Sequence, residues 1–370
     1  MTQEQLHTMF VLGLFTCIVL RAFSAQAKVV ESFDDCKGFF YKDNEPEGMD
    51  QNAKKICQKL EYDHYYYATL YSVHRRIPLY SAYVFDSECS STAGRKENWH
   101  IEPQISQPES QTDYMVSERD SDENIIKKHQ AISSDYSDSG YDLGLLNPNS
   151  FQCDEGRIAT FTLTNAAPID ESFDRIQWKN WESALRSFLR SKLDSHNGSA
   201  TVYIVTGTVP DDDVQMPHKG TSEDPERVTV PSHIWTAVCY KHHLNDTKSF
   251  SFGYIGENQL EGGIWLMTVS DLNDKLSSLY SEQLKSHQSI KIFVGDCFDD
   301  SKELNEVKGV FNKLINPNQV DEMATDVQTM SLTQKRVRRS HHGCCCLCYY
   351  YYWCWNGYQW VYCVETRCAK

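Results

Sequence analysis

Two acidic residues, Asp174 and Glu182, lie eight positions apart in a stretch from Glu171 to Leu193 whose apolar residues recur at helical spacing. At about 100° per residue, their carboxylates would sit about 80° apart, along one flank of a helix. Carboxylate oxygens are hard ligands that can hold Mg²⁺, whereas acids on the solvated side of an amphipathic helix usually bind nothing. The pair therefore predicts either a metal-binding flank or an ordinary polar helix face.

An ordered series of short motifs surrounds this helix. The motifs are Tyr141–Pro148 (YDLGLLNP), Ala159–Pro168 (ATFTLTNAAP), Phe173–Glu182, Arg76–Tyr83, Trp99–Gln104 and Val230–Ala237. Together they resemble the DNA/RNA non-specific endonucleases, and within that family the vertebrate endonuclease domain-containing 1 group. The resemblance runs from about Cys36 to Val269 and rests on the order of the motifs, because any one of them alone is a weak signal.

This resemblance implies a fold and a mechanism. The implied fold is α+β, with a mixed, mainly antiparallel sheet, packed helices and a ββα-metal finger, here followed by a Cys-rich C-terminal tail. In the finger, a strand carries a His general base, and the next helix carries an Asn that binds one Mg²⁺ beside the scissile phosphate of DNA or RNA. The base deprotonates water, the metal stabilises developing charge, and arginines neutralise the phosphate.

The first part of the family motif is altered in this chain. The family writes Asp-Arg-Gly-His, and this sequence has Asp142-Leu143-Gly144-Leu145. The general-base position is therefore Leu145 and a phosphate-contacting Arg position is Leu143, and neither side chain can accept a proton or hold an anion. A positioned general base raises the reaction rate by a factor of about 10²–10⁴, so its loss slows the reaction by that factor. Loss of a charge-stabilising group slows the reaction by a comparable further factor. The sequence thus predicts little turnover.

The second part of the motif is better kept. By the same resemblance, Asp174 stands at the metal-ligand Asn position, Glu182 at the position of an acidic helper residue, and Arg95 at that of a second phosphate-contacting Arg. We expect Mg²⁺ to bind at Asp174 if the site is retained. A relocated general base would restore activity, and the histidines near family motifs are His100, His129 and His233.

Three hypotheses for function follow. The leading one is a secreted, catalytically degenerate nuclease-fold protein that acts by binding an extracellular or surface ligand, or nucleic acid weakly. The second is an active Mg²⁺-dependent phosphodiesterase with a relocated base. The third is a precursor of a Cys-rich C-terminal peptide.

Periodicity predicts the elements that would position these residues. The helix is the stretch from Glu171 to Leu193. Two acidic stretches without periodicity, Ile105–Gly140 and Val209–Glu226, are predicted as solvated loops. Runs of β-branched and aromatic residues predict strands at Ser81–Phe85, Ile158–Leu163, Thr201–Val205, Ser249–Tyr254 and Ile264–Val269.

The charge of the chain limits its partners. It has 370 residues and a formal net charge of −15. Residues 1–27 carry no net charge and residues 335–370 carry a net charge of +5, so the net charge of residues 28–334 is −20. Nucleic-acid binding over a broad surface depends on Lys and Arg displacing counterions. We therefore expect any contact with nucleic acid to be weak, although the net charge leaves a small, locally basic site open.

The N-terminus predicts export. An apolar run, Met9–Leu20, is followed by Ala25-Gln26-Ala27, the small-x-small form that signal peptidase cuts after Ala27. An exported chain with dispersed cysteines is expected to form disulfides, whose pairing the sequence leaves open. The sequons at Asn197 and Asn245 are compatible with glycosylation. The predicted location is extracellular.

The C-terminus differs from the body. The basic cluster Lys335–Arg339 fits a proprotein-convertase site with cleavage after Arg339, or else a plain basic linker. The last thirty residues hold seven cysteines and many Tyr and Trp, which predicts a disulfide-stapled peptide or a tail that contacts a membrane. The expected organisation is a signal peptide (1–27), an endonuclease-like domain (28–295), a linker (296–340) and a tail (341–370).

Overall fold

The structure is a computed structural model. It describes residues 29–49, 52–61, 64–86, 98–216, 227–260, 262–284, 287–298, 301–315, 347–355 and 360–368. The predicted sites at Ala27, Arg95 and Arg339 lie outside the described residues, so they stay predictions.

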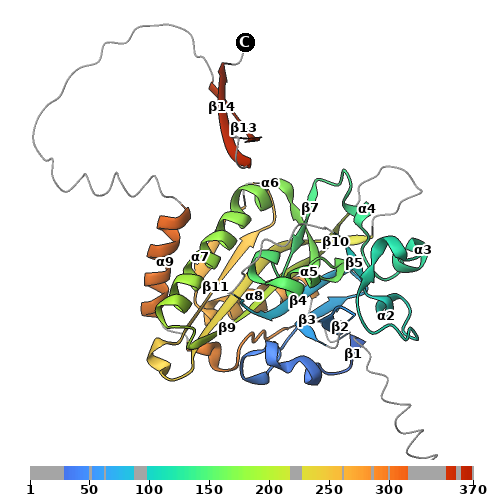
Figure 1. Cartoon of the computed structure of the whole chain (residues 1–370), viewed down its shortest axis with the longest axis horizontal. Helices are drawn as coiled ribbons and strands as arrows, with labels where there is room; N and C mark the ends of the chain where they lie inside the picture. Colours follow the sequence, from blue (N-terminus) through green and yellow to red (C-terminus); the bar gives the residue numbers. More distant parts are fainter. Residues whose placement is uncertain are drawn as a thin grey trace, which may run out of the picture. The chain divides into compact units, whose positions relative to one another are not determined.

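An antiparallel sheet organises the body (Figure 1). Its strands, in spatial order, are β1 (Val29–Val30), β2 (Lys54–Lys59), β3 (Tyr65–Ser72), β4 (Ile77–Val84), β9 (Ala200–Met216), β10 (Val228–His242), β11 (Phe250–Glu257) and β12 (Ile264–Met267). Every neighbouring pair in this sheet is antiparallel. Helices pack on both faces, so the predicted α+β class with a mainly antiparallel sheet is confirmed.

Each face of the sheet buries its own apolar cluster. On one face lie α7 (Lys179–Ser195) and α9 (Ser301–Ile315), and α7 contributes Leu185, Phe188 and Leu189 to the cluster. On the other face lie α8 (Val269–Leu284) and the short helices η1 (Phe33–Phe39) and η2 (Tyr41–Asp43). The apolar spacing that predicted the helix thus marks the side of α7 that packs on the sheet.

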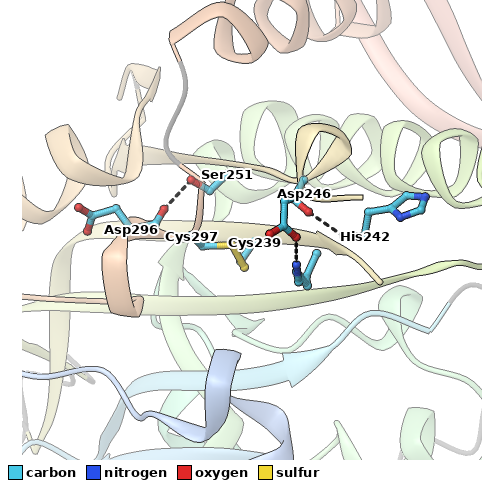
Figure 2. The surroundings of a disulfide bond; sticks show 8 residues. Cys239, His242, Asp246, Ser251, Asp296 and Cys297 are labelled. Atoms are coloured by element: carbon cyan, nitrogen blue, oxygen red, sulfur yellow. Dashed lines mark hydrogen bonds and ion pairs between the residues drawn. A yellow bond between two sulfur atoms is a disulfide. The ribbon is translucent and has the colours of Figure 1, made fainter. Parts of the chain in front are cut away.

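Disulfides tie segments that are far apart in sequence to this sheet. Cys36 bonds to Cys57 in β2, and Cys239 in β10 bonds to Cys297. Figure 2 shows the second bond beside the hydrogen bond that Ser251 donates to the carbonyl of Asp296, at 2.7 Å. Cys153 is also disulfide-bonded. The expectation of disulfides in the body is therefore confirmed.

Short elements fill the connections. They are β5 (His100–Ile101), α2 (Pro103–Ser106), β6 (Val116–Ser117), η3 (Glu118–Asp120), α3 (Glu123–Ile126), α4 (Ser133–Tyr136), η4 (Asn149–Phe151), α5 (Asp154–Ala159), η5 (Leu163–Asn165), η7 (Asp246–Lys248) and η8 (Val294–Cys297). The prediction of a solvated loop at Ile105–Gly140 was wrong, because Ile126 and Ile132 are buried and Arg227 pairs with Asp135. Short helices bury apolar residues without a long periodic signal.

Two other local predictions were wrong. Val209–Met216, part of the second predicted loop, continues β9, because β10 pairs with Val209, Pro210, Gln215 and Met216 on either side of its acidic residues. The predicted strand Ile158–Leu163 is the end of α5 followed by η5, because the hydroxyl of Thr160 bonds to the carbonyl of Arg157 and favours a local turn over a ladder.

The compact body continues past the predicted boundary at residue 295. Within the predicted linker, α9 places Leu304, Val307 and Phe311 in the same apolar cluster as α7. A separate unit contains a two-stranded antiparallel hairpin, β13 (Leu347–Trp355) and β14 (Trp360–Cys368). Among the described residues, no helix combines the length and apolar character needed to cross a membrane.

One buried side chain, Asn165, joins the sheet to the hairpin that carries the altered motif. Its amide oxygen accepts hydrogen bonds from Ser81 of β4 at 2.8 Å and from the backbone of Asn147 at 3.0 Å. Its amide nitrogen donates to the carbonyls of Asn147 and Thr160, at 3.1 and 3.0 Å. All four hydrogen bonds are buried, so Asn165 fixes the position of the hairpin relative to the sheet.

We expect Asn165→Ala to lower the free energy of unfolding by about 2–4 kcal/mol, because it leaves several buried partners without a hydrogen bond. Urea unfolding followed by tryptophan fluorescence measures this loss. Asn124→Ala, at an exposed position on α3, is the control and should change stability little. Equal, small losses in both variants would contradict the role given to Asn165.

Candidate functional site

Two short strands and a helix form the finger that the resemblance predicts. β7 (Tyr141–Leu145) pairs antiparallel with β8 (Ala166–Asp170), with Leu145 opposite Ala166 and Leu143 opposite Pro168. The chain then enters α6 (Glu171–Phe173), the π-helical turn η6 (Asp174–Trp178) and α7. Gly144 is needed here, since a Cβ at this position would lie 2.1 Å from the Ile169 side chain.

The two altered positions present only hydrocarbon to the site. Leu143 is half-buried and packs against two apolar clusters, which include Ile132 and Tyr136. Leu145 is half-buried at the end of β7. Neither residue offers a group that titrates or binds an anion. At these two positions the strand holds neither a general base nor a phosphate clamp.

The Asp that opens the motif is held by a cation from the helix. Asp142 accepts two hydrogen bonds from Arg175, at 2.9 and 2.8 Å. Arg175 also pairs with Glu171 one turn earlier, at 3.2 Å. The hydrogen bond to Asp142 is the main cause that raises the pKa of the Arg175 guanidinium. A bidentate guanidinium–carboxylate pair of this kind fixes both groups, so Asp142 locks the hairpin to the helix.

Asp174 is the buried member of the site. It is 4% exposed, and Lys179 donates to its carboxylate at 2.5 Å. Burial raises the pKa of the Asp174 carboxyl, the charge and hydrogen bond of Lys179 lower it, and the neighbouring Asp142 raises it. A buried carboxylate needs a positive partner, and in this structure Lys179 is that partner.

Glu182 lies closer to Asp174 than a regular helix would place it. The π turn adds a residue, so the two side chains are about 20° apart around the axis instead of the about 80° predicted from the sequence. Both acids still lie along one flank of the helix, and only the angle differs, because a π turn has no periodic signature. Burial and, to a smaller extent, the charge of Asp174 raise the pKa of Glu182 to about 8, against the charge of Lys179 and a hydrogen bond from Trp178, which lower it.

The family implies a metal ion here, and the donor chemistry can be compared with that need. Asp142, Asp174 and Glu182 offer the hard oxygen ligands that Mg²⁺ prefers. However, the carboxylates of Asp142 and Asp174 are already bound to Arg175 and Lys179. Among the described residues, no group of three or more His, Cys, Asp or Glu side chains is placed to hold a metal ion. In this arrangement, the site does not fit a divalent cation.

None of the three candidate histidines contacts these acids. His100 donates from Nδ1 to the carbonyl of Phe161 at 2.9 Å, and Nδ1 of His233 lies 3.0 Å from the Ser232 hydroxyl. Burial lowers the pKa of His233. His129 lies in the segment after α3. The side chains that shift the pKa of Asp174 and Glu182 include no histidine.

A basic group that the sequence reading missed flanks the site. Arg186 lies one helical turn after Glu182, Arg190 one turn further, and Arg157 comes from α5. The pKa of Arg186 is lowered by burial and then by the positive charges of Arg190 and Arg157, so the three guanidiniums lie near one another. In the described part of the chain, no carboxylate pairs with any of them. The four-residue spacing of Arg186 and Arg190 after Glu182 was a signal that could have revealed these two residues, whereas Arg157 comes from another helix.

The predicted glycosylation sites lie together elsewhere. Asn197 follows the last turn of α7, and Asn245 lies between β10 and β11, both with exposed side chains. A backbone hydrogen bond of 3.0 Å from His243 to Ser199 joins the two loops. The length of α7 therefore separates both sequons from the finger, which is at the start of that helix.

The raised pKa of Glu182 predicts a pH dependence of stability. The folded state favours the neutral carboxyl of Glu182. The contribution of this group to stability is therefore complete below its ordinary pKa of 4.5 and is lost as the pH rises through its folded-state pKa of about 8. We expect Glu182→Gln to match wild type near about pH 5 and to be more stable near about pH 9, by on the order of 1–3 kcal/mol. Urea unfolding at the two pH values measures this, with Glu123→Gln on α3 as control. A difference that does not change with pH would count against the assignment.

Comparisons with known proteins agree with the geometry. The endonuclease domain-containing 1 protein of Homo sapiens is 31% identical over 314 residues, covering 83% of this chain and 57% of the relative. Its Mus musculus counterpart is 29% identical over 302 residues, covering 80% and 54%. The chain thus spans about half the length of the curated relatives it matches.

A solved structure described as the EndoG/EndoGI complex, on the mechanism of EndoG inhibition, is similar over 58% of this chain and 82% of its own, at 21% identity and a TM-score of 0.38. The model of the DNA/RNA non-specific endonucleases matches residues 49–285. That match covers more than half of the sequence and includes the finger, so the chain belongs to the DNA/RNA non-specific endonuclease family.

Proposed function

We propose that this protein is a secreted, catalytically degenerate member of its family that binds nucleic acid weakly without cleaving it. The observation that carries the proposal is the pair Leu143 and Leu145, which stand at the Arg and His positions of the family motif on β7. Loss of the general base lowers the cleavage rate by a factor of about 10²–10⁴, and loss of the phosphate-contacting Arg lowers it by a comparable factor.

Retention of the scaffold supports a binding role. The hairpin, the Asn165 contacts and the helix are intact, while the chemistry of two strand positions is gone. On the helix that carries Glu182, Arg186 and Arg190, together with Arg157 of α5, form a basic patch without carboxylate partners among the described residues. Guanidinium groups bind phosphates through paired hydrogen bonds, so this patch suits a phosphate backbone.

The charge of the body makes this binding weak and dependent on salt. Residues 28–334 carry −20, which repels a polyanion outside the patch. Three phosphate contacts would release about three counterions, so affinity should fall roughly 40-fold between 50 and 200 mM salt.

Mg²⁺ is not required by this proposal. Members of the family are generally metal-dependent, and the sequence predicts the ion at Asp174. A bound divalent cation would supply charge stabilisation at a scissile phosphate. In this chain Lys179 supplies positive charge to Asp174 instead, and binding by the arginine patch needs no metal.

Secretion is supported by several features of the sequence and the body. The signal-like N-terminus ends at Ala27, and disulfides such as Cys36–Cys57 persist in oxidising compartments. Asn197 and Asn245 are exposed, as glycan acceptors must be. Leu244, next to Asn245, is 87% exposed, and a glycan there would shield it from water.

The first test measures cleavage and binding with the full chain. With plasmid DNA and RNA in Mg²⁺ or Mn²⁺ we expect no cleavage, and with a labelled DNA duplex we expect weak anisotropy binding that salt weakens. Replacing Arg157, Arg186 and Arg190 by Gln should greatly weaken that binding and reduce the salt slope of the binding that remains by about three.

The control for binding replaces Lys37, Lys275 and Lys291, three exposed lysines on the opposite face of the sheet, by Gln. This control variant loses the same three positive charges as the arginine variant, and its affinity for the DNA duplex should stay close to that of wild type. Robust wild-type cleavage that Asp174→Ala abolishes would sink the proposal. Gain of cleavage on combining Leu143→Arg with Leu145→His would support loss of the base and clamp as the cause.

The second test measures processing. We expect mammalian cells to secrete a chain that begins at Lys28, because the signal ends at Ala27. Asn197→Gln and Asn245→Gln should each remove one glycan in intact-mass spectrometry, and neither should abolish binding, because neither removes an arginine of the patch. An unprocessed N-terminus, or retention inside the cell, would contradict secretion. Only intact C-termini at Lys370 would rule out peptide release after Arg339.

A further inference from the structure

The π turn in the finger helix changes which side chain lies over Asp174. The backbone N–H of Lys179 donates to the carbonyl of Asp174, five residues earlier, which is the hydrogen bond that defines a π turn. In a regular α-helix, residues five apart point about 140° from each other. The inserted residue reduces this angle to about 40°, so Lys179 and Asp174 share one side of the helix.

The resulting contact is asymmetric in its exposure. The Asp174 side chain is 6% exposed, the Lys179 side chain is 57% exposed, and their charged atoms lie 2.5 Å apart. The stem of the lysine thus starts at the surface while its ammonium reaches a carboxylate closed off from water. The lysine ammonium therefore supplies the positive charge that this buried carboxylate needs if it is ionised.

Two of the three acids at the site each have a cation from the chain itself. Asp142 is bound by Arg175, with atoms 2.8 Å apart, and Asp174 is bound by Lys179. Both cations come from the same helical segment as Asp174, so folding of the finger delivers them automatically. A divalent cation at Asp174 would first have to displace the ammonium.

We infer that the Lys179 ammonium occupies the place of the divalent metal ion of the family, so that the finger is a self-neutralised site closed to metal by its own π turn. The protein would then fold and bind its ligands in the absence of metal. This inference goes beyond the proposed function, since it holds whether or not nucleic acid is the ligand.

The test is a metal titration of the full chain without nucleic acid. Binding of Mn²⁺ is followed by electron paramagnetic resonance and that of Mg²⁺ by calorimetry. Wild type should show no site that depends on Asp174. Lys179→Met should gain one Mn²⁺ site, with affinity raised by at least about tenfold, and adding Asp174→Asn should remove that gain.

Matched variants keep the result decisive. Lys179→Arg keeps the cation and should bind no metal, and Lys179→Gln, whose amide can still bond to Asp174, replaces the Met variant if that one fails to fold. Wild-type metal binding that Asp174→Asn abolishes would overturn the inference. So would folded Met and Gln variants that gain no site. Because no nucleic acid is present, these outcomes are independent of the binding test of the arginine patch.

Discussion

A carboxylate closed off from water, that of Asp174, sets the constraint on which the rest of the finger depends. Leaving such a group charged and unpaired in a protein interior is costly, so the surrounding structure must supply a positive charge or keep the group protonated. Here Lys179 supplies the charge at 2.5 Å, and the π turn is the backbone change that lets it do so. The geometry of the helix is therefore coupled to the electrostatics of one side chain.

The scaffold and the chemistry of this site rest on different residues. Asn165, Gly144 and the sheet position the hairpin through hydrogen bonds and close packing that do not involve the side chains of Leu143 and Leu145. Leu143 packs against two apolar clusters. Hydrocarbon is stable at such a position, where an unpaired polar group would be costly. The fold of the hairpin therefore does not depend on a polar side chain at this position.

Much of the architecture followed from local patterns. β-branched and aromatic runs located β4, β9, β11 and β12, and the apolar period located the helix that starts at Glu171. The predictions at Ile105–Gly140 and Ile158–Leu163 failed, because short helices have too few residues to show a period and threonine hydroxyls stabilised a turn in place of a strand. α9 was taken for linker, since its amphipathic face is explained only by the cluster on α7.

The sequence by itself determined the family and which residues stand on the strand of the finger, because the identity of a residue is a covalent fact. Leu145 cannot accept a proton in any conformation. Only the tertiary structure decided how the remaining charges pair. Lys179 reaches Asp174 through an inserted helical residue, and Arg157 approaches Arg186 from another helix. Such pairings depend on backbone register and on contacts between distant segments, which no local pattern in the chain records.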